Sequence, residues 1–98
     1  MIKIHITEET IKISGHANYA KYGHDIVCSA VSSIVTTSIN GILAFKETII
    51  VEEEKESLLI KIKVHDKITD TLIKNMIDLL KEVERQYQKN VKIIEEGD

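Results

Sequence analysis

One stretch of the chain holds most of the residues that can carry out chemistry. Residues 15–28 contain the only cysteine, Cys28, together with two of the four histidines and two of the four glycines. His16 lies twelve residues before Cys28. A thiolate and an imidazole that exchanges protons with it are the two groups that nucleophilic cysteine chemistry requires. The pattern therefore predicts Cys28 as a nucleophile and His16 as its general base.

The position of Cys28 strengthens this prediction. An apolar pattern of helical period begins at Ile26, and Asp25 directly before it is a good N-cap residue. Cys28 then occupies the third helical position, where free backbone N–H groups and the helix dipole favour an anion. A thiol in such a place ionises with a pKa of ~3.5–7.5 instead of ~8.5. Asp25 has two possible roles, since its carboxylate can cap the helix and can also orient His16.

Several neighbours can support the site. Ser32 lies one turn beyond Cys28 on the same helical face, where it can donate to the sulfur or leave room for another element. Gly15 and Gly23 allow backbone conformations that place N–H groups near an oxyanion. Between these glycines we expect a mobile loop that covers the site and contacts the substrate, although its tyrosines can equally be ordinary loop aromatics. The candidate substrate-contacting residues are Ala17, Tyr19, Ala20, Tyr22 and Gly23.

The same residues also allow other interpretations. A lone cysteine in a small domain is often a buried apolar side chain. Zinc could be bound by the four potential ligands His16, His24, Asp25 and Cys28, but their spacing matches no common zinc pattern. We therefore expect no metal and no cofactor.

The length, composition and net charge of the chain limit the class of protein. Ninety-eight residues suit a single domain, residues 1–98, with 43% hydrophobic and 30% charged residues and no run of eighteen consecutive apolar positions. The first residues alternate in polarity, so we expect no signal peptide, no membrane span and a cytoplasmic protein. One cysteine cannot form an internal disulfide. The net charge of −3 argues against direct binding to nucleic acid.

Polarity patterns predict seven elements. Strict alternation predicts strands, and apolar residues at helical spacing predict helices. The expected order is two short strands within residues 2–13, a helix over 26–43, strands over 47–53 and 58–64, a helix that begins at Asp66, Thr69 or Asp70 and reaches Tyr87, and a strand over 91–94. This ββαββαβ order predicts an α+β sandwich with a mainly antiparallel sheet and two helices on one or both faces.

The opening stretch also resembles a known family. The matching residues are Gly15-His16-Ala17, Ala20, Gly23, Asp25-Ile26-Val27-Cys28 and Ser32. They resemble the signature of the bacterial ribosomal-processing cysteine proteases, the Prp or YsxB-like family. Chain length and element order agree with that family along essentially the whole sequence. Ser29 stands where the family commonly has a small residue such as Ala.

The resemblance implies a specific function. It implies a homodimeric protease that removes the N-terminal extension of a large-subunit ribosomal protein, with His16 and Cys28 as the catalytic pair. Cleavage would follow a hydrophobic, aromatic-rich part of the extension, and residues 18–24 would correspond to the family's cover loop. Two other classes stay open: a ribosome-associated binding protein without activity, and a zinc-binding or redox-sensing module.

Overall fold

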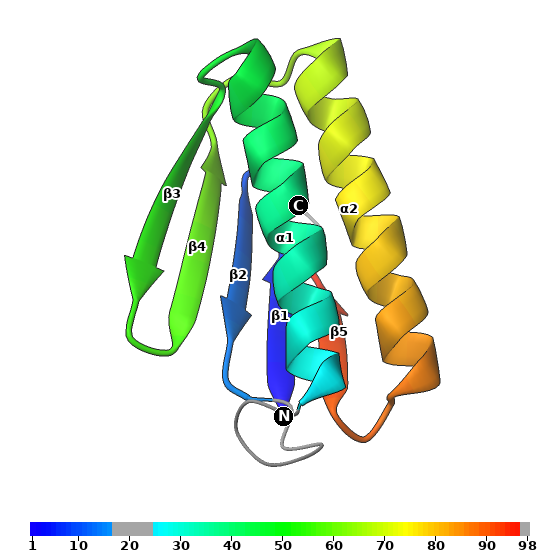
Figure 1. The fold of residues 1–98 in the computed structure, drawn as a ribbon. Coiled ribbons are helices and arrows are strands. Elements are labelled where there is room, and N and C mark those ends of the chain that lie inside the picture. Colours follow the sequence, from blue (N-terminus) through cyan, green and yellow to red (C-terminus); the bar gives the residue numbers. More distant parts are fainter. Residues whose placement is uncertain (17–24, 97–98) are drawn as a thin grey trace.

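The computed structural model describes residues 1–16 and 25–96 of the chain. The elements follow the order that the sequence predicts. They are β1 (Ile2–Ile6), β2 (Thr10–Ser14), α1 (Ile26–Phe45), β3 (Ile49–Glu54), β4 (Ser57–Ile62), α2 (Lys67–Gln86) and β5 (Val91–Glu95). The ββαββαβ prediction is confirmed (Figure 1).

The five strands form one mixed sheet in the order β3-β4-β2-β1-β5. Three of the four strand pairs are antiparallel, as predicted, whereas β5 runs parallel to β1 with Val91 opposite Ile2. A parallel neighbour needs a long crossover connection, and α2 supplies it. The sheet therefore joins the two ends of the chain, with β1 between β2 and β5.

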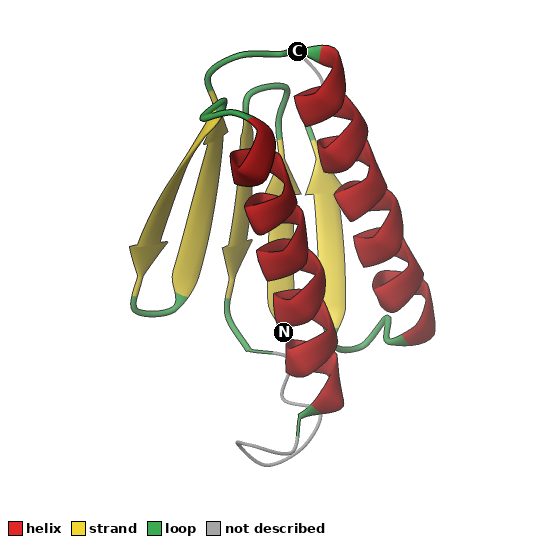
Figure 2. Ribbon diagram, turned by 45° about the horizontal axis from the view of Figure 1, so that its top comes forward, coloured by secondary structure: helices red, strands yellow, loops and turns green. Residues whose placement is uncertain are grey.

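Both helices cover the same face of the sheet, so the fold has two layers (Figure 2). The core lies between these layers, where alternating strand residues meet one stripe of each helix. Its buried members include Ile4 and Ile60 from the sheet, Val27 and Val31 from α1, and Met76 from α2. The sequence had left open whether one or both faces would be covered, because alternation identifies only the buried side of a strand.

Element boundaries differ from prediction by one or two residues, mainly beside Thr48. The predicted strands 47–53 and 58–64 are observed as residues 49–54 and 57–62. The carbonyl of Thr48 accepts hydrogen bonds from the backbone N–H groups of both Lys63 and Val64, at 2.8 and 3.2 Å, outside the regular ladder. The buried hydroxyls of Thr48 and Thr69 lie 2.6 Å apart, which joins this corner to the first turn of α2.

The helix boundaries are clear in the structure. Helix α1 extends to Phe45, two residues beyond the predicted end. Of the three candidate starting residues for the second helix, Asp66 is the N-cap, and its side chain accepts a 2.8 Å hydrogen bond from the Thr69 N–H. Thr69 and Asp70 lie within α2.

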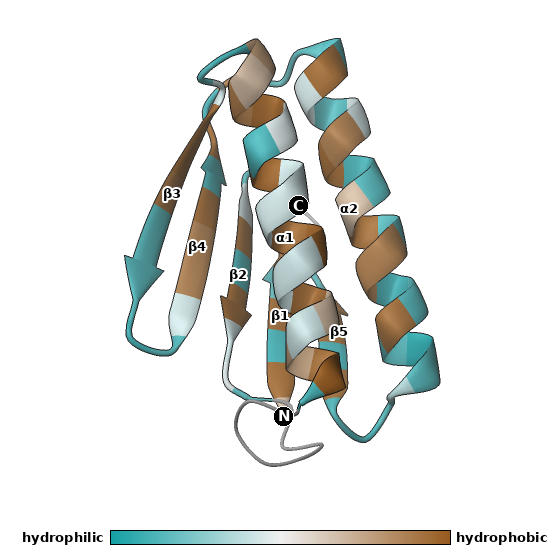
Figure 3. Cartoon of the chain, in the orientation of Figure 1, coloured by the Kyte–Doolittle hydropathy of each residue, from teal (hydrophilic) through white to brown (hydrophobic). Residues whose placement is uncertain are grey.

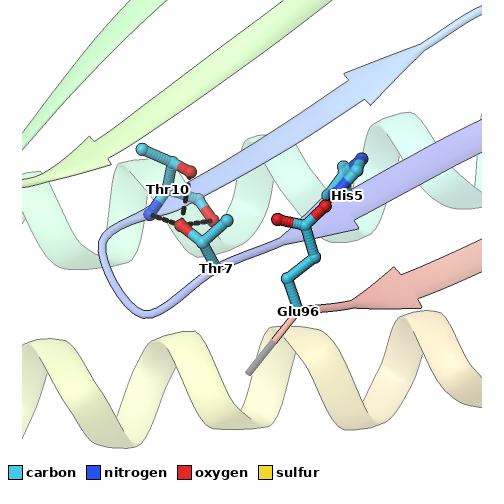
Figure 4. Close-up of polar contacts among 4 residues, drawn as sticks. All are labelled: His5, Thr7, Thr10 and Glu96. Atoms are coloured by element: carbon cyan, nitrogen blue, oxygen red, sulfur yellow. Dashed lines mark hydrogen bonds and ion pairs between the residues drawn. The ribbon is translucent and has the colours of Figure 1, made fainter. Parts of the chain in front are cut away.

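A set of polar contacts closes the end of the sheet at the β1–β2 turn (Figure 4). The hydroxyls of Thr7 and Thr10 lie 2.6 Å apart, and the Thr10 backbone N–H donates to the Thr7 hydroxyl at 3.0 Å. His5 Nε2 contacts the Glu96 carboxylate directly after β5. The contact with Glu96 gives His5 a structural role.

The two helices differ in surface character. Figure 3 shows repeated hydrophilic segments along α2, whereas α1 is pale or hydrophobic over most of its length. Helix α1 contains no charged residue, and by length and composition alone it could cross a membrane. The core helix of a soluble protein passes the same test, and α1 packs Val27, Val31, Val35 and Ile42 into the core.

Candidate active site

Cys28 lies in the first turn of α1, and the predicted N-cap is confirmed. One oxygen of the Asp25 carboxylate accepts 3.0 Å hydrogen bonds from the backbone N–H groups of both Val27 and Cys28. The cap occupies these two N–H groups and fixes the start of the helix, so it holds the backbone of Cys28 in the first turn. Its side chain is half-buried and packs against the hydrophobic core, which leaves part of the residue accessible.

His16 follows the end of β2, and its side chain is exposed. The end of β2 and the start of α1 lie at the same end of the molecule (Figure 1). Imidazole Nε2 of His16 lies 3.7 Å from Glu56 Oε1 at the turn between β3 and β4. The structure thus brings His16, the start of α1 and the β3–β4 turn to one end of the fold.

Gly15 is required for the close approach of two chain segments before His16. Its φ of +85° lies in the left-handed region that glycine tolerates best. A Cβ at this position would lie 2.5 Å from the backbone oxygen of Met1, where no side chain fits. The Gly15 N–H donates to the Glu56 carbonyl at 3.0 Å, so this donor already has a partner and is a poor candidate for the oxyanion hole.

Glu56 is the neighbour of the site that the sequence did not identify. In the sequence, Glu56 belongs to an acidic run whose simplest interpretation is the solvated end of a hairpin. Its nearness to His16 follows from the sheet order, in which β4 lies beside β2 and Ser57 pairs with Ser14. A polar residue at a hairpin turn, in register with the end of a neighbouring strand, was the signal that could have revealed it.

Of the remaining predicted residues, only Ser32 lies in the part of the chain that the structure describes. Ser32 is exposed on α1 one turn beyond Cys28, as the helical spacing required. The substrate-loop prediction falls on residues outside those that the structure describes. These residues are Ala17, Tyr19, Ala20, Tyr22 and Gly23.

The described residues do not form a metal site. Within residues 1–16 and 25–96, no group of three or more His, Cys, Asp and Glu side chains is arranged to hold a metal ion. His24, one of the four potential zinc ligands, lies outside this part of the chain.

The fold and the site together define a class of protein. A cysteine in the first turn of an N-capped helix, at the same end of a two-layer α+β fold as a histidine, is typical of a thiol hydrolase. A family model described as cysteine protease Prp matches residues 1–92. The chain therefore belongs to the Prp family and is a cysteine protease.

Individual relatives agree with this assignment. The ribosomal processing cysteine protease Prp of Bacillus subtilis (strain 168) is 27% identical over 95 residues, which cover 86% of this chain and 82% of the relative. The protein of the same name from Mycoplasma pneumoniae is 51% identical over 35 residues, 36% of this chain and 35% of the relative. A crystal structure of Prp from S. aureus with a covalently linked product peptide has a TM-score of 0.92 at 23% identity, covering 98% of this chain and 100% of that one. The structural likeness confirms the fold.

Proposed function

We propose that this protein is an endopeptidase that removes the N-terminal extension of a large-subunit ribosomal protein. Cys28 is the nucleophile and His16 the general base. The observation that carries the proposal is the capped first turn of α1, which presents the only thiol of the chain at a helix N-terminus. The relatives named above support the choice of substrate, because their names describe ribosomal processing.

The proposed reaction has two steps. The imidazole of His16 takes the proton of the Cys28 thiol, and the sulfur attacks the carbonyl carbon of the peptide bond. His16 then gives the proton to the leaving amine as the C–N bond breaks, which leaves a thioester. Water attacks the thioester and releases the new carboxylate, while the sulfur regains its proton. The S. aureus protein, which has been crystallised with a substrate peptide and with a covalently linked product peptide, supports a covalent route.

Incubation with peptides from the same organism tests the proposal. The peptides should span the N-terminal extension of a large-subunit ribosomal protein, and mass spectrometry should detect a single cut. Cys28→Ala should abolish cleavage and keep the circular dichroism spectrum of the wild type. Cleavage by Cys28→Ala would exclude the thiol mechanism. If the wild-type protein cuts no such peptide and its thiol resists alkylation near neutral pH, a binding function without activity is the better explanation.

We also propose that the protein acts as a cytoplasmic homodimer without direct contact to nucleic acid or membrane. Support for the dimer comes from α1, whose exposed side includes Leu43 and Phe45, which are 41% and 68% exposed. A 20-residue helix without any charge on its exposed side is unusual for a surface that faces only water. A second protomer would cover this surface in the simplest way.

A further inference from the structure

A groove of about 270 Å³ lies between α1 and the β3–β4 hairpin. Its helical rim includes Ser32 and Thr36, one and two turns beyond Cys28. The hairpin rim includes Ser57, next to the Glu56 that approaches His16. The groove thus lies along α1 from one turn beyond the proposed nucleophile.

Apolar side chains form the floor of this groove. Val31 and Val35 contribute from α1, and Ile13 and Leu58 contribute from paired positions on β2 and β4. The valines belong to the buried core, whereas Ile13 and Leu58 are partly exposed. Ligand sites are usually concave and combine apolar side chains with a few placed polar groups. A larger hollow of about 540 Å³ lies between the end of α2 and β5, but charged and polar side chains line most of it and it contains no nucleophile.

The charge of the groove comes from Glu53 and Glu54 on β3. Neither carboxylate forms an ion pair with another residue in the described part of the chain. Their neighbour Glu52 is different, because its carboxylate pairs with Lys61 on β4. The groove is therefore bordered by negative charge on β3, with Glu53 on the helix-covered face of the sheet, as strand alternation from Ile49 and Val51 requires, and Glu54 at the end of the strand.

We propose that this groove binds the substrate segment that flanks the cleaved bond, and that Glu53 and Glu54 select a lysine or arginine in it. The proposal rests on the proposed function, with Cys28 as nucleophile. An apolar floor fits the aliphatic stem of such a side chain, and the carboxylates on the rim fit its charged end.

The length of the groove predicts which substrate positions are selected. Ser32 and Thr36 lie four and eight residues beyond Cys28, or ~6 and ~12 Å along the helix axis at ~1.5 Å per residue. An extended peptide rises ~3.3 Å per residue. A basic side chain in the groove would therefore stand about two to four residues from the cleaved bond.

Binding to the inactive Cys28→Ala protein tests this selection. The probes are fluorescent peptides that span the extension junction of the ribosomal protein, with Lys, Gln or Glu at the second, third or fourth position on either side of the cleaved bond. For at least one position, Kd measured by anisotropy should be about fivefold or more lower with Lys than with Glu, because exposed charge pairs contribute modestly. The preference should shrink at high salt.

A matched set of variants locates the effect. Adding E53Q and E54Q to the Cys28→Ala protein should remove the preference for Lys, whereas adding E52Q, on the same strand but paired with Lys61, should retain it. Equal affinity for Lys and Glu peptides at all positions, no peptide binding at all, or a preference that survives E53Q/E54Q would overturn the proposal. A Lys preference in binding, together with a wild-type protein that cuts none of the peptides, would support the groove and reject the proposed function.

Discussion

The carboxylate of Asp25 accepts a 3.0 Å hydrogen bond from the backbone N–H of Cys28. The residue that carries the proposed nucleophile is therefore held directly by the helix cap. Removal of the cap would loosen the first turn and change the surroundings of the thiol at the same time. Stability and thiol reactivity should respond together to substitutions at Asp25.

Asp25→Ala should lower the free energy of unfolding by about 1 kcal/mol, the usual value for loss of an N-cap side chain. It should also change the rate at which iodoacetamide alkylates Cys28, since the Cys28 N–H loses the partner that holds it in the first turn. Urea unfolding and the rate of alkylation measure the two effects.

Asp25→Asn is the matched control, because asparagine caps helices about as well as aspartate. We expect this variant to keep both stability and peptide cleavage close to the wild type. A loss of cleavage of ~10²-fold or more with unchanged stability would give the carboxylate a second role as the group that orients His16.

His16→Ala should reduce kcat/KM by ~10²–10⁴-fold, the usual contribution of a general base. Peptide affinity, measured in the Cys28→Ala background, should change little. Glu56→Gln should lower kcat/KM by less than tenfold. The side chains of His16 and Glu56 are 57% and 65% exposed, and exposed ion pairs are weak. If His16→Ala turns over at a rate near the wild type, His24 should be replaced next.

Periodicity was sufficient to predict the element order. Alternation predicts the first strand, with Ile2, Ile4 and Ile6 on its buried face. Helical spacing from Ile26 predicts α1 in the same way. In both cases the local sequence alone shows which face is buried. The parallel pairing of β5 with β1 was not predicted, because it depends on which strand edge remains free after the hairpins form. No local pattern contains that information.

At the candidate site, contacts between chain neighbours could be predicted from the sequence, but contacts between distant segments could not. Asp25 and Cys28 are neighbours in the chain, so the cap could be predicted from spacing alone. The approach of Glu56 to His16 depends on β4 lying beside β2, a contact between residues 40 positions apart. The acidic groove wall depends on the same strand order, so it too required the three-dimensional structure.

Gly15→Ala should destabilise the fold by roughly 1–3 kcal/mol, since it forces a side chain into the left-handed region. The added Cβ would also contact the Met1 backbone oxygen, which lies 2.5 Å from its ideal position. Chemical denaturation measures the loss. Gly41→Ala is a suitable control, because its added Cβ would have as its nearest neighbour only Leu72 Cδ1 at an ordinary 3.9 Å. A Gly15→Ala protein as stable as the wild type would show that the chain around Gly15 can move away from Met1 with little loss of stability.

The Asp66 cap of α2 should make stability depend on acid pH. Hydrogen bonds from the backbone and side chain of Thr69, and then the charge of Lys46, lower the pKa of Asp66 below its usual 3.8. A carboxyl with a lowered folded-state pKa stabilises the fold above its unfolded-state pKa, and the contribution is lost as pH falls through the folded-state value. The stability difference between wild type and Asp66→Asn should therefore shrink as pH decreases below about 4. A difference that stays constant from pH 6 to pH 2 would contradict this assignment.

The uncharged surface of α1 predicts the site of self-association. Wild-type protein should sediment as a dimer at micromolar concentration. Dimer formation would remove the exposed apolar side chains of Leu43 and Phe45 from water. Leu43→Glu combined with Phe45→Glu should shift the protein to monomer, since charge on this surface would be desolvated in the interface. Leu79→Glu on α2 is the control, because Leu79 is 43% exposed, comparable to Leu43, but lies on the charged helix. If the wild type is monomeric, or if only Leu79→Glu dissociates the dimer, α1 is not the interface and its uncharged surface needs another explanation.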